Sequence, residues 1–222
     1  MQIKVLYEDN HLLAVYKPAG VLTQADKTGD ISLLDEVKKY LKEKYRKPGN
    51  VYLGMIHRLD RPASGIVLFA KTSKGASRLS WQFREQTVEK IYHALVLGKI
   101  EQKSGTLISF LKKDPAKNLV KVYKTAKNGG EKAELSFAVI SQNNKYSLLE
   151  IKLKTGKPHQ VRAQLADFGH PVVGDLKYGA AFALPDKSIY LCATSLSFNL
   201  ATTPERKTIT IPIPASWQKY LL

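Results

Sequence analysis

The order of apolar and polar positions predicts many short β-strands and only a few helices. Residues 3–7 follow an alternating pattern, which is typical of a strand. A continuous apolar run at 66–70 predicts a strand buried inside a sheet. The same kinds of pattern predict further extended segments at 12–16, 51–56, 92–97, 135–140, 146–153, 191–198 and 209–213.

Three segments show the spacing of an α-helix instead. Apolar residues recur three and four positions apart over 32–45, with Ser32 as a natural N-cap, and helices are also predicted at 73–86 and 159–168. Many strands joined by short turns predict an α+β fold with a mixed, largely antiparallel sheet. We expect one domain over residues 1–222, with the Lys-rich segment 102–130 as a mobile insertion in the sheet.

The charge of the chain indicates a polyanionic partner. Lys and Arg number 35 and Asp and Glu 19, which gives a net charge of +16. Each cation placed against a phosphate releases condensed counterions, so RNA or DNA is favoured, although Lys-rich surfaces are also common in soluble proteins.

Cys192 is the single cysteine, which indicates a reducing compartment. Because no signal peptide and no membrane-length apolar stretch is visible, we expect a cytoplasmic protein outside the membrane.

Several kinds of chemistry lack their sequence signals. No Gly-rich phosphate loop follows a predicted strand, and no Gly-x-Ser-x-Gly motif occurs. The five histidines are scattered and form no cluster at metal-ligand spacing. We therefore expect no metal and no cofactor, only side chains and water.

A polar loop between two predicted strands contains the candidate for chemistry. Asp60 lies in this loop with Arg58 and Arg61 on either side. A carboxylate between arginines stays ionised, so it can act as a nucleophile or a base. A structural ion pair, or an Asx turn that holds the loop, explains the same pattern.

Five motifs along the chain resemble the RluA family of pseudouridine synthases. The first is the catalytic string His57-Arg58-Leu59-Asp60, with Ser64-Gly65 and Ala70-Lys71 after it. The others are Lys17-Pro18-Ala19-Gly20, Lys90-Ile91-Tyr92 with Ala94, Val96 and Gly98, the run from Thr155 to Arg162, and Gly169 to Asp175 with Tyr178-Gly179. The resemblance spans nearly the whole chain. It implies a pseudouridine synthase catalytic domain, without an S4 domain, that isomerises uridines in rRNA, tRNA or both.

The resemblance also implies the roles of three catalytic residues. Asp60 matches the essential aspartate, which attacks the ribose or the base, or removes a ribose proton so that a glycal forms. Tyr92 matches the tyrosine that stacks on the target base; an ordinary half-buried strand aromatic is the alternative. Arg162 matches the arginine whose fork pairs with the catalytic carboxylate, and a surface helix arginine is the alternative. His159 and Arg162 are three positions apart, so we expect them on one face of a helix.

RNA contacts are expected from basic residues around these motifs. The target uridine must be extruded from folded RNA at a cost of a few kcal/mol. Arg58 matches a family arginine that helps to fill the space left by the flipped base. His57 is expected to have a structural or RNA-contact role. The full set of expected RNA-binding residues is Arg58, His57, Arg61, Lys71, Lys90, Lys157 and His159.

The sequence departs from the family pattern at a few positions and leaves two other functions open. Pro62-Ala63 replaces a commoner pair, Lys157 stands where arginine is usual, and Cys192 stands where histidine is frequent.

One alternative function is a catalytically silent RNA-binding protein on the same fold. The other is a glycoside or nucleoside hydrolase, which generally needs a second carboxylate or a metal. The other motif carboxylate, Asp175, is expected to order a turn. We expect a monomer.

Overall fold

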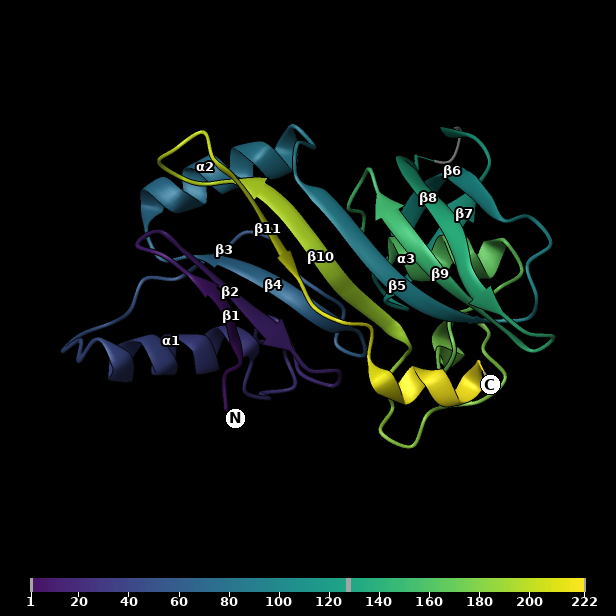
Figure 1. Cartoon of the computed structure of the whole chain (residues 1–222), viewed down its shortest axis with the longest axis horizontal. Helices are drawn as coiled ribbons and strands as arrows, with labels where there is room; N and C mark the ends of the chain where they lie inside the picture. Colours follow the sequence, from purple (N-terminus) through teal and green to yellow (C-terminus); the bar gives the residue numbers. More distant parts are fainter. Residues whose placement is uncertain (1, 127–128, 222) are drawn as a thin grey trace. The chain divides into compact units, whose positions relative to one another are not determined.

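The computed structural model describes residues 2–126 and 129–221 as two compact units. Unit 1 comprises the chain up to Val88 together with Ser195–Ile211. Unit 2 comprises Glu89–Thr194 and the residues from Pro212 onward. The strand β10 (Leu191–Asn199) contributes its first four residues to unit 2 and the rest to unit 1. Figure 1 labels the elements of both units.

Unit 1 contains a sheet with the strand order β1-β2-β4-β10. The pairs β1–β2 and β2–β4 are antiparallel, as are β3 with β4 and β11 with β10. Every residue of β4 is buried, which confirms the central strand predicted from its apolar run. The bounds of these strands are β1 (Val5–Glu8), β2 (Leu12–Lys17), β3 (Gly54–Met55), β4 (Ser64–Ala70) and β11 (Arg206–Thr210).

Two helices complete unit 1, and both begin at side-chain caps. The helix α1 (Leu33–Lys44) has the predicted N-cap Ser32, which forms a capping box with Asp35. The helix α2 (Ser73–Arg84) begins after Thr72, whose hydroxyl accepts from the Gly75 N–H. The buried face of α2 contributes Leu79 to a core cluster shared with β2, β4 and β10.

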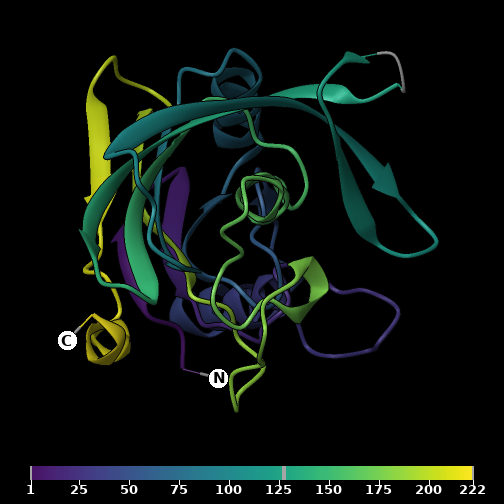
Figure 2. The same ribbon diagram turned by 90° about the vertical axis from the view of Figure 1, so that its right-hand side faces the viewer.

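Unit 2 contains an antiparallel sheet with the order β5-β9-β8-β6-β7. The helix α3 (Gln160–Asp167) packs against β6 and β7, where Ala163 meets Leu111 and Val120. Figure 2 shows α3 nearly end-on within the curve of these strands. The strand bounds are β5 (Glu89–Leu97), β6 (Ser104–Asp114), β7 (Leu119–Tyr123), β8 (Glu131–Gln142) and β9 (Tyr146–Leu153), with 3₁₀ helices η2 (Leu176–Tyr178) and η3 (Ala215–Tyr220).

The structure confirms the α+β class with a largely antiparallel sheet, and it corrects the segment 102–130. Apart from 127–128, which lie outside the described residues, this segment is mostly the strands β6 and β7 rather than a mobile insertion. Its lysines hid the strand pattern because they occupy the exposed positions of β6 and β7. The expected strand at 51–56 is paired only at Gly54–Met55, and that at 209–213 begins at Arg206 and ends at Thr210. The prediction of one domain over 1–222 stays a prediction.

Candidate active site

Asp60 lies in unit 1, in the loop that leads from β3 into β4, and is partly exposed. The neighbouring residue, Leu59, is buried, and its N–H and carbonyl both bond the hydroxyl of Thr23, at 3.2 and 2.9 Å. On the other side, the Ala63 N–H donates to the Asp60 carbonyl at 3.1 Å. The main chain is therefore held on both sides of the carboxylate.

Lys17, at the end of β2, ties a second loop to this one. Its side chain has no solvent exposure, and its Nζ donates to the carbonyls of Pro18, Val21 and Arg61 at 3.0, 2.7 and 3.1 Å. Burial lowers the pKa of Lys17 to about 7; the negative charge of Asp60 opposes this fall and the positive charge of Arg61 adds to it. The Lys-Pro motif thus supports the Asp60 loop, a role that the sequence did not reveal.

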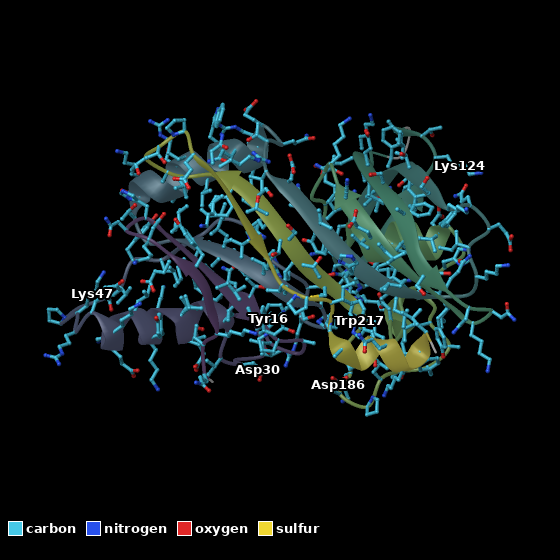
Figure 3. All side chains as sticks on the ribbon, in the orientation of Figure 1. Tyr16, Asp30, Lys47, Lys124, Asp186 and Trp217 are labelled. Carbon is cyan, nitrogen blue, oxygen red and sulfur yellow. The ribbon has the colours of Figure 1, made fainter. Side chains whose placement is uncertain are left out.

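The two arginines beside Asp60 are both exposed. Arg61 donates from Nε to the Gly20 carbonyl at 3.0 Å and pairs with Asp30 at 2.7 Å; Asp30 is labelled in Figure 3. These contacts are at the surface, where ion pairs are weak. The guanidinium groups of Arg58 and Arg61 therefore remain accessible to solvent.

Two of the expected RNA-binding residues, His57 and Lys71, make contacts within the protein. The Nε2 atom of His57 accepts the Leu68 N–H at 2.9 Å, and its ring stacks on Phe83 at 4.9 Å between centroids. The ammonium of Lys71 donates to a carboxylate oxygen of Glu8 and to the Asp9 carbonyl, both at 2.7 Å. The expected RNA contacts of His57 and Lys71 stay predictions beside these structural contacts.

Arg162 lies in unit 2, on α3, and is 4% exposed. Its Nε and Nη2 donate to the two carboxylate oxygens of Asp175, at 2.6 and 2.8 Å. Asp175 is therefore one partner of the Arg162 fork, and the expected pairing of Arg162 with the catalytic carboxylate stays a prediction. Asp175 also orders its turn, because its backbone carbonyl accepts the N–H groups of Tyr178 and Ala180.

Tyr178 brings His159 and Arg162 together. His159 precedes α3 with a positive φ of 51°, and its Nδ1 lies 2.8 Å from the hydroxyl oxygen of Tyr178. The guanidinium of Arg162 lies over the Tyr178 ring, 5.0 Å from its centre. Both side chains therefore contact Tyr178, although His159 is the N-cap residue and lies just before the helix rather than on its face. The Tyr178-Gly179 motif was visible in the sequence, but no role was assigned to it.

The other expected residues of unit 2 lie on or beside the sheet. Tyr92 is on β5, opposite Ile151 of β9, and is partly exposed. Lys90, two positions earlier, is largely covered, and burial lowers its pKa. Lys157 pairs with Glu131 at 2.6 Å. The expected site residues thus fall into a unit 1 group around Asp60 and a unit 2 group with Tyr92 and Arg162.

The comparisons define the class of the protein. The sequence profile of the RNA pseudouridylate synthase family matches residues 11–167, a range that contains Asp60, Tyr92 and Arg162. The chain therefore belongs to this family, and its relatives place it among the RluA-type members. The family consists of isomerases that convert uridine to pseudouridine in RNA.

Two relatives and one solved structure illustrate how similar the chain is to known members of the family. The chain is 34% identical to the uncharacterized RNA pseudouridine synthase YhcT of Bacillus subtilis, over 82% of this chain and 60% of that protein. It is 31% identical to tRNA pseudouridine synthase C of Vibrio parahaemolyticus, over 99% of this chain and 94% of that protein. Among solved structures, human RNA pseudouridylate synthase domain containing 4 matches with a TM-score of 0.79 at 20% identity, over 98% and 91% of the two chains. This last likeness supports the fold alone.

Membrane-spanning helices and metal-binding clusters are both missing from the described residues. Over residues 2–126 and 129–221, no helix is long and apolar enough to cross a membrane. In the same ranges, no three His, Cys, Asp or Glu side chains form a group that could hold a metal ion.

Proposed function

We propose that this protein isomerises specific uridines in rRNA, tRNA or both, with Asp60 as the catalytic carboxylate and no cofactor. The observation that carries the proposal is the position of Asp60 within the matched family range, in a loop whose main chain is fixed on both sides. Relatives named for both RNA classes, tRNA pseudouridine synthase C and ribosomal large subunit pseudouridine synthase C, support the substrate range. We also propose that it acts in the cytoplasm as a monomer.

The reaction needs a carboxylate that is ready to act and a uridine delivered to it. Asp60 attacks the ribose or the base, or it removes a ribose proton. In each route the N1–C1′ glycosidic bond breaks, C5 is joined to C1′, the C5 proton is lost and N1 gains a proton. Tyr92 and Arg162 serve the same reaction, Tyr92 by stacking on the base. The buried pair with Asp175 fixes the side chain of Arg162, because a charge this buried is stable only with a well-placed partner.

Arg58 and Arg61 are the cations that we assign to the RNA from unit 1. Extruding a stacked uridine costs a few kcal/mol, and contacts with phosphates offset part of this cost. Both side chains are exposed, which leaves them accessible to a polyanion. Lys90, Lys157 and His159 stay in the proposed RNA-binding set of unit 2.

The test is a pseudouridine map of rRNA and tRNA from cells that lack this protein. One or a few pseudouridines should disappear, return with the wild-type chain, and stay absent with Asp60→Ala at equal protein level. We expect the variant to lose activity by several orders of magnitude, because the reacting group itself is removed. If every pseudouridine remains, or if Asp60→Ala restores the lost ones, a catalytically silent RNA-binding protein is the better account.

A further inference from the structure

A cavity of about 360 Å³ lies within unit 1, between α2 and the loop that joins β10 to β11. Figure 1 shows this loop, in yellow, running beside α2. None of the residues that line it belongs to the Asp60 loop or to the expected site residues. The proposed reaction therefore leaves this cavity without a role.

The walls of the cavity are joined by hydrogen bonds. Gln82 of α2 is 4% exposed, and its amide donates to the Asn199 carbonyl at 2.8 Å. The Asn199 N–H donates back to the amide oxygen of Gln82 at 2.8 Å. The Leu200 N–H then closes the loop on the Glu205 carbonyl at 2.9 Å. Because the helix is bonded to the end of β10 and the loop that follows is closed by its own hydrogen bond, the cavity is preformed rather than created by a ligand.

The lining combines an aromatic face with positive charge. Trp81 is 51% exposed, which is unusual for so large an apolar side chain on a helix. Lys74 and Arg78 stand seven and three positions before it, so the three side chains share one face of α2. No Asp or Glu is among the lining residues; Glu85 is nearby in sequence but pairs with its exposed neighbour Arg84 at 3.5 Å.

We propose that this pocket holds one unpaired nucleotide of the substrate RNA, apart from the target uridine. The base stacks on the indole of Trp81, and the adjoining phosphates lie against Lys74 and Arg78. An aromatic platform beside cations is the usual way to bind single-stranded nucleic acid without reading its sequence. The cavity volume lies in the range of small-ligand sites. The choice of RNA as the occupant rests on the proposed function, and the net charge of +16 agrees with it.

Tryptophan fluorescence tests the stacking directly, because the chain has only two tryptophans. Trp217 is 3% exposed and stacks on Tyr190, so its emission should change little when RNA binds. A ten-residue oligouridylate titrated into the full chain should quench the emission, and this quenching should be missing in Trp81→Phe. The same quenching should occur in Asp60→Ala, which separates this site from the catalytic proposal.

Affinity measured by anisotropy of a labelled oligouridylate gives the second readout. Trp81→Ala should weaken binding about 5- to 150-fold, and Trp81→Phe should recover most of it because a stacking face is kept. Lys74→Ala with Arg78→Ala should make the plot of log affinity against log salt shallower, by about 0.7 for each phosphate that the two cations neutralise in the wild type. Two matched controls are the double change Lys39→Ala with Lys42→Ala, both exposed on α1, and the single change Tyr52→Ala at an exposed position. Neither control should change the affinity or its salt dependence.

Two results would overturn the proposal for this pocket without contradicting the catalytic role proposed for Asp60. One is anisotropy that reports binding while the Trp81 emission stays constant, since the RNA then binds elsewhere. The other is a Trp81→Ala variant that binds as tightly as the wild type, which would make this face a candidate for a protein partner instead. If Asp60→Ala abolishes pseudouridine formation while RNA neither quenches Trp81 nor binds more weakly to Trp81→Ala, the proposed function stands and the nucleotide-binding role of the pocket is rejected.

Discussion

The side chain of Lys17 ends among three backbone carbonyl oxygens, one of them from Arg61, the residue after Asp60. A fully buried lysine is rare unless its charge is partnered. Here the partners are main-chain groups from two loops, together with the charge of Asp60. Lys17 therefore stabilises the Asp60 loop and also helps to fix the position of the Asp60 carboxylate.

Lys17→Met keeps most of the side-chain volume but removes every hydrogen-bond donor. The three carbonyls lose a buried donor, so the free energy of unfolding should fall by roughly 1–3 kcal/mol. Pseudouridine formation should slow as well, because the Arg61 carbonyl is no longer held. Urea denaturation and a single-turnover assay measure the two effects. Lys39→Met, at an exposed position, is the control, and equal stability of the two variants would contradict the role of Lys17.

At the scale of elements, a cluster of polar side chains connects β1, α1 and the end of β4. Glu8 accepts from Lys44 at 2.7 Å, from Lys71 at 2.7 Å and from Tyr45 at 2.6 Å. Lys44 is in the last turn of α1, and Lys71 follows β4 directly. Burial alone would raise the pKa of Glu8, but these hydrogen bonds outweigh it and lower the pKa to about 2.

Glu8→Gln should destabilise the chain at neutral pH by roughly 2 kcal/mol, because charged hydrogen bonds are replaced by weaker ones. The folded pKa of Glu8 lies below its ordinary value of 4.5. Its contribution is therefore fully present above about pH 4.5 and is lost as the pH falls toward 2. Thermal unfolding of the wild type and the variant across this pH range measures the difference. A stability difference that stays constant down to pH 2 would contradict this account.

The whole molecule carries a net charge of +16, and RNA is the polyanion that its family acts on. Affinity for RNA should therefore depend steeply on salt. For about six phosphate contacts, binding of the purified chain to bulk tRNA should weaken roughly a thousandfold between about 50 and 200 mM salt. Filter binding at several salt concentrations measures the slope. A flat dependence would show that phosphates contribute little and that the charge serves another purpose.

The local patterns of the sequence predicted most elements, with one clear failure. The capped helix at α1 and the buried strand at β4 were found because a cap residue and an apolar run act over a few residues only. The strands β6 and β7 were missed because their solvent-facing positions are polar and Lys-rich. Pairing in the sheet stabilises such segments, and pairing partners are not visible in a single stretch of sequence.

The sequence alone determined the family, the α+β class and the order of the motifs, because these depend on residue types at short, fixed spacings. Only the tertiary structure showed that the fork of Arg162 engages Asp175, that Lys17 holds the Asp60 loop, and that Gln82 joins α2 to the end of β10, more than a hundred residues away. Each of these interactions is a hydrogen bond between distant residues, and its energy depends on burial and on a geometry of a few tenths of an ångström. Such geometry arises when the elements pack together, and no pattern along the chain records it.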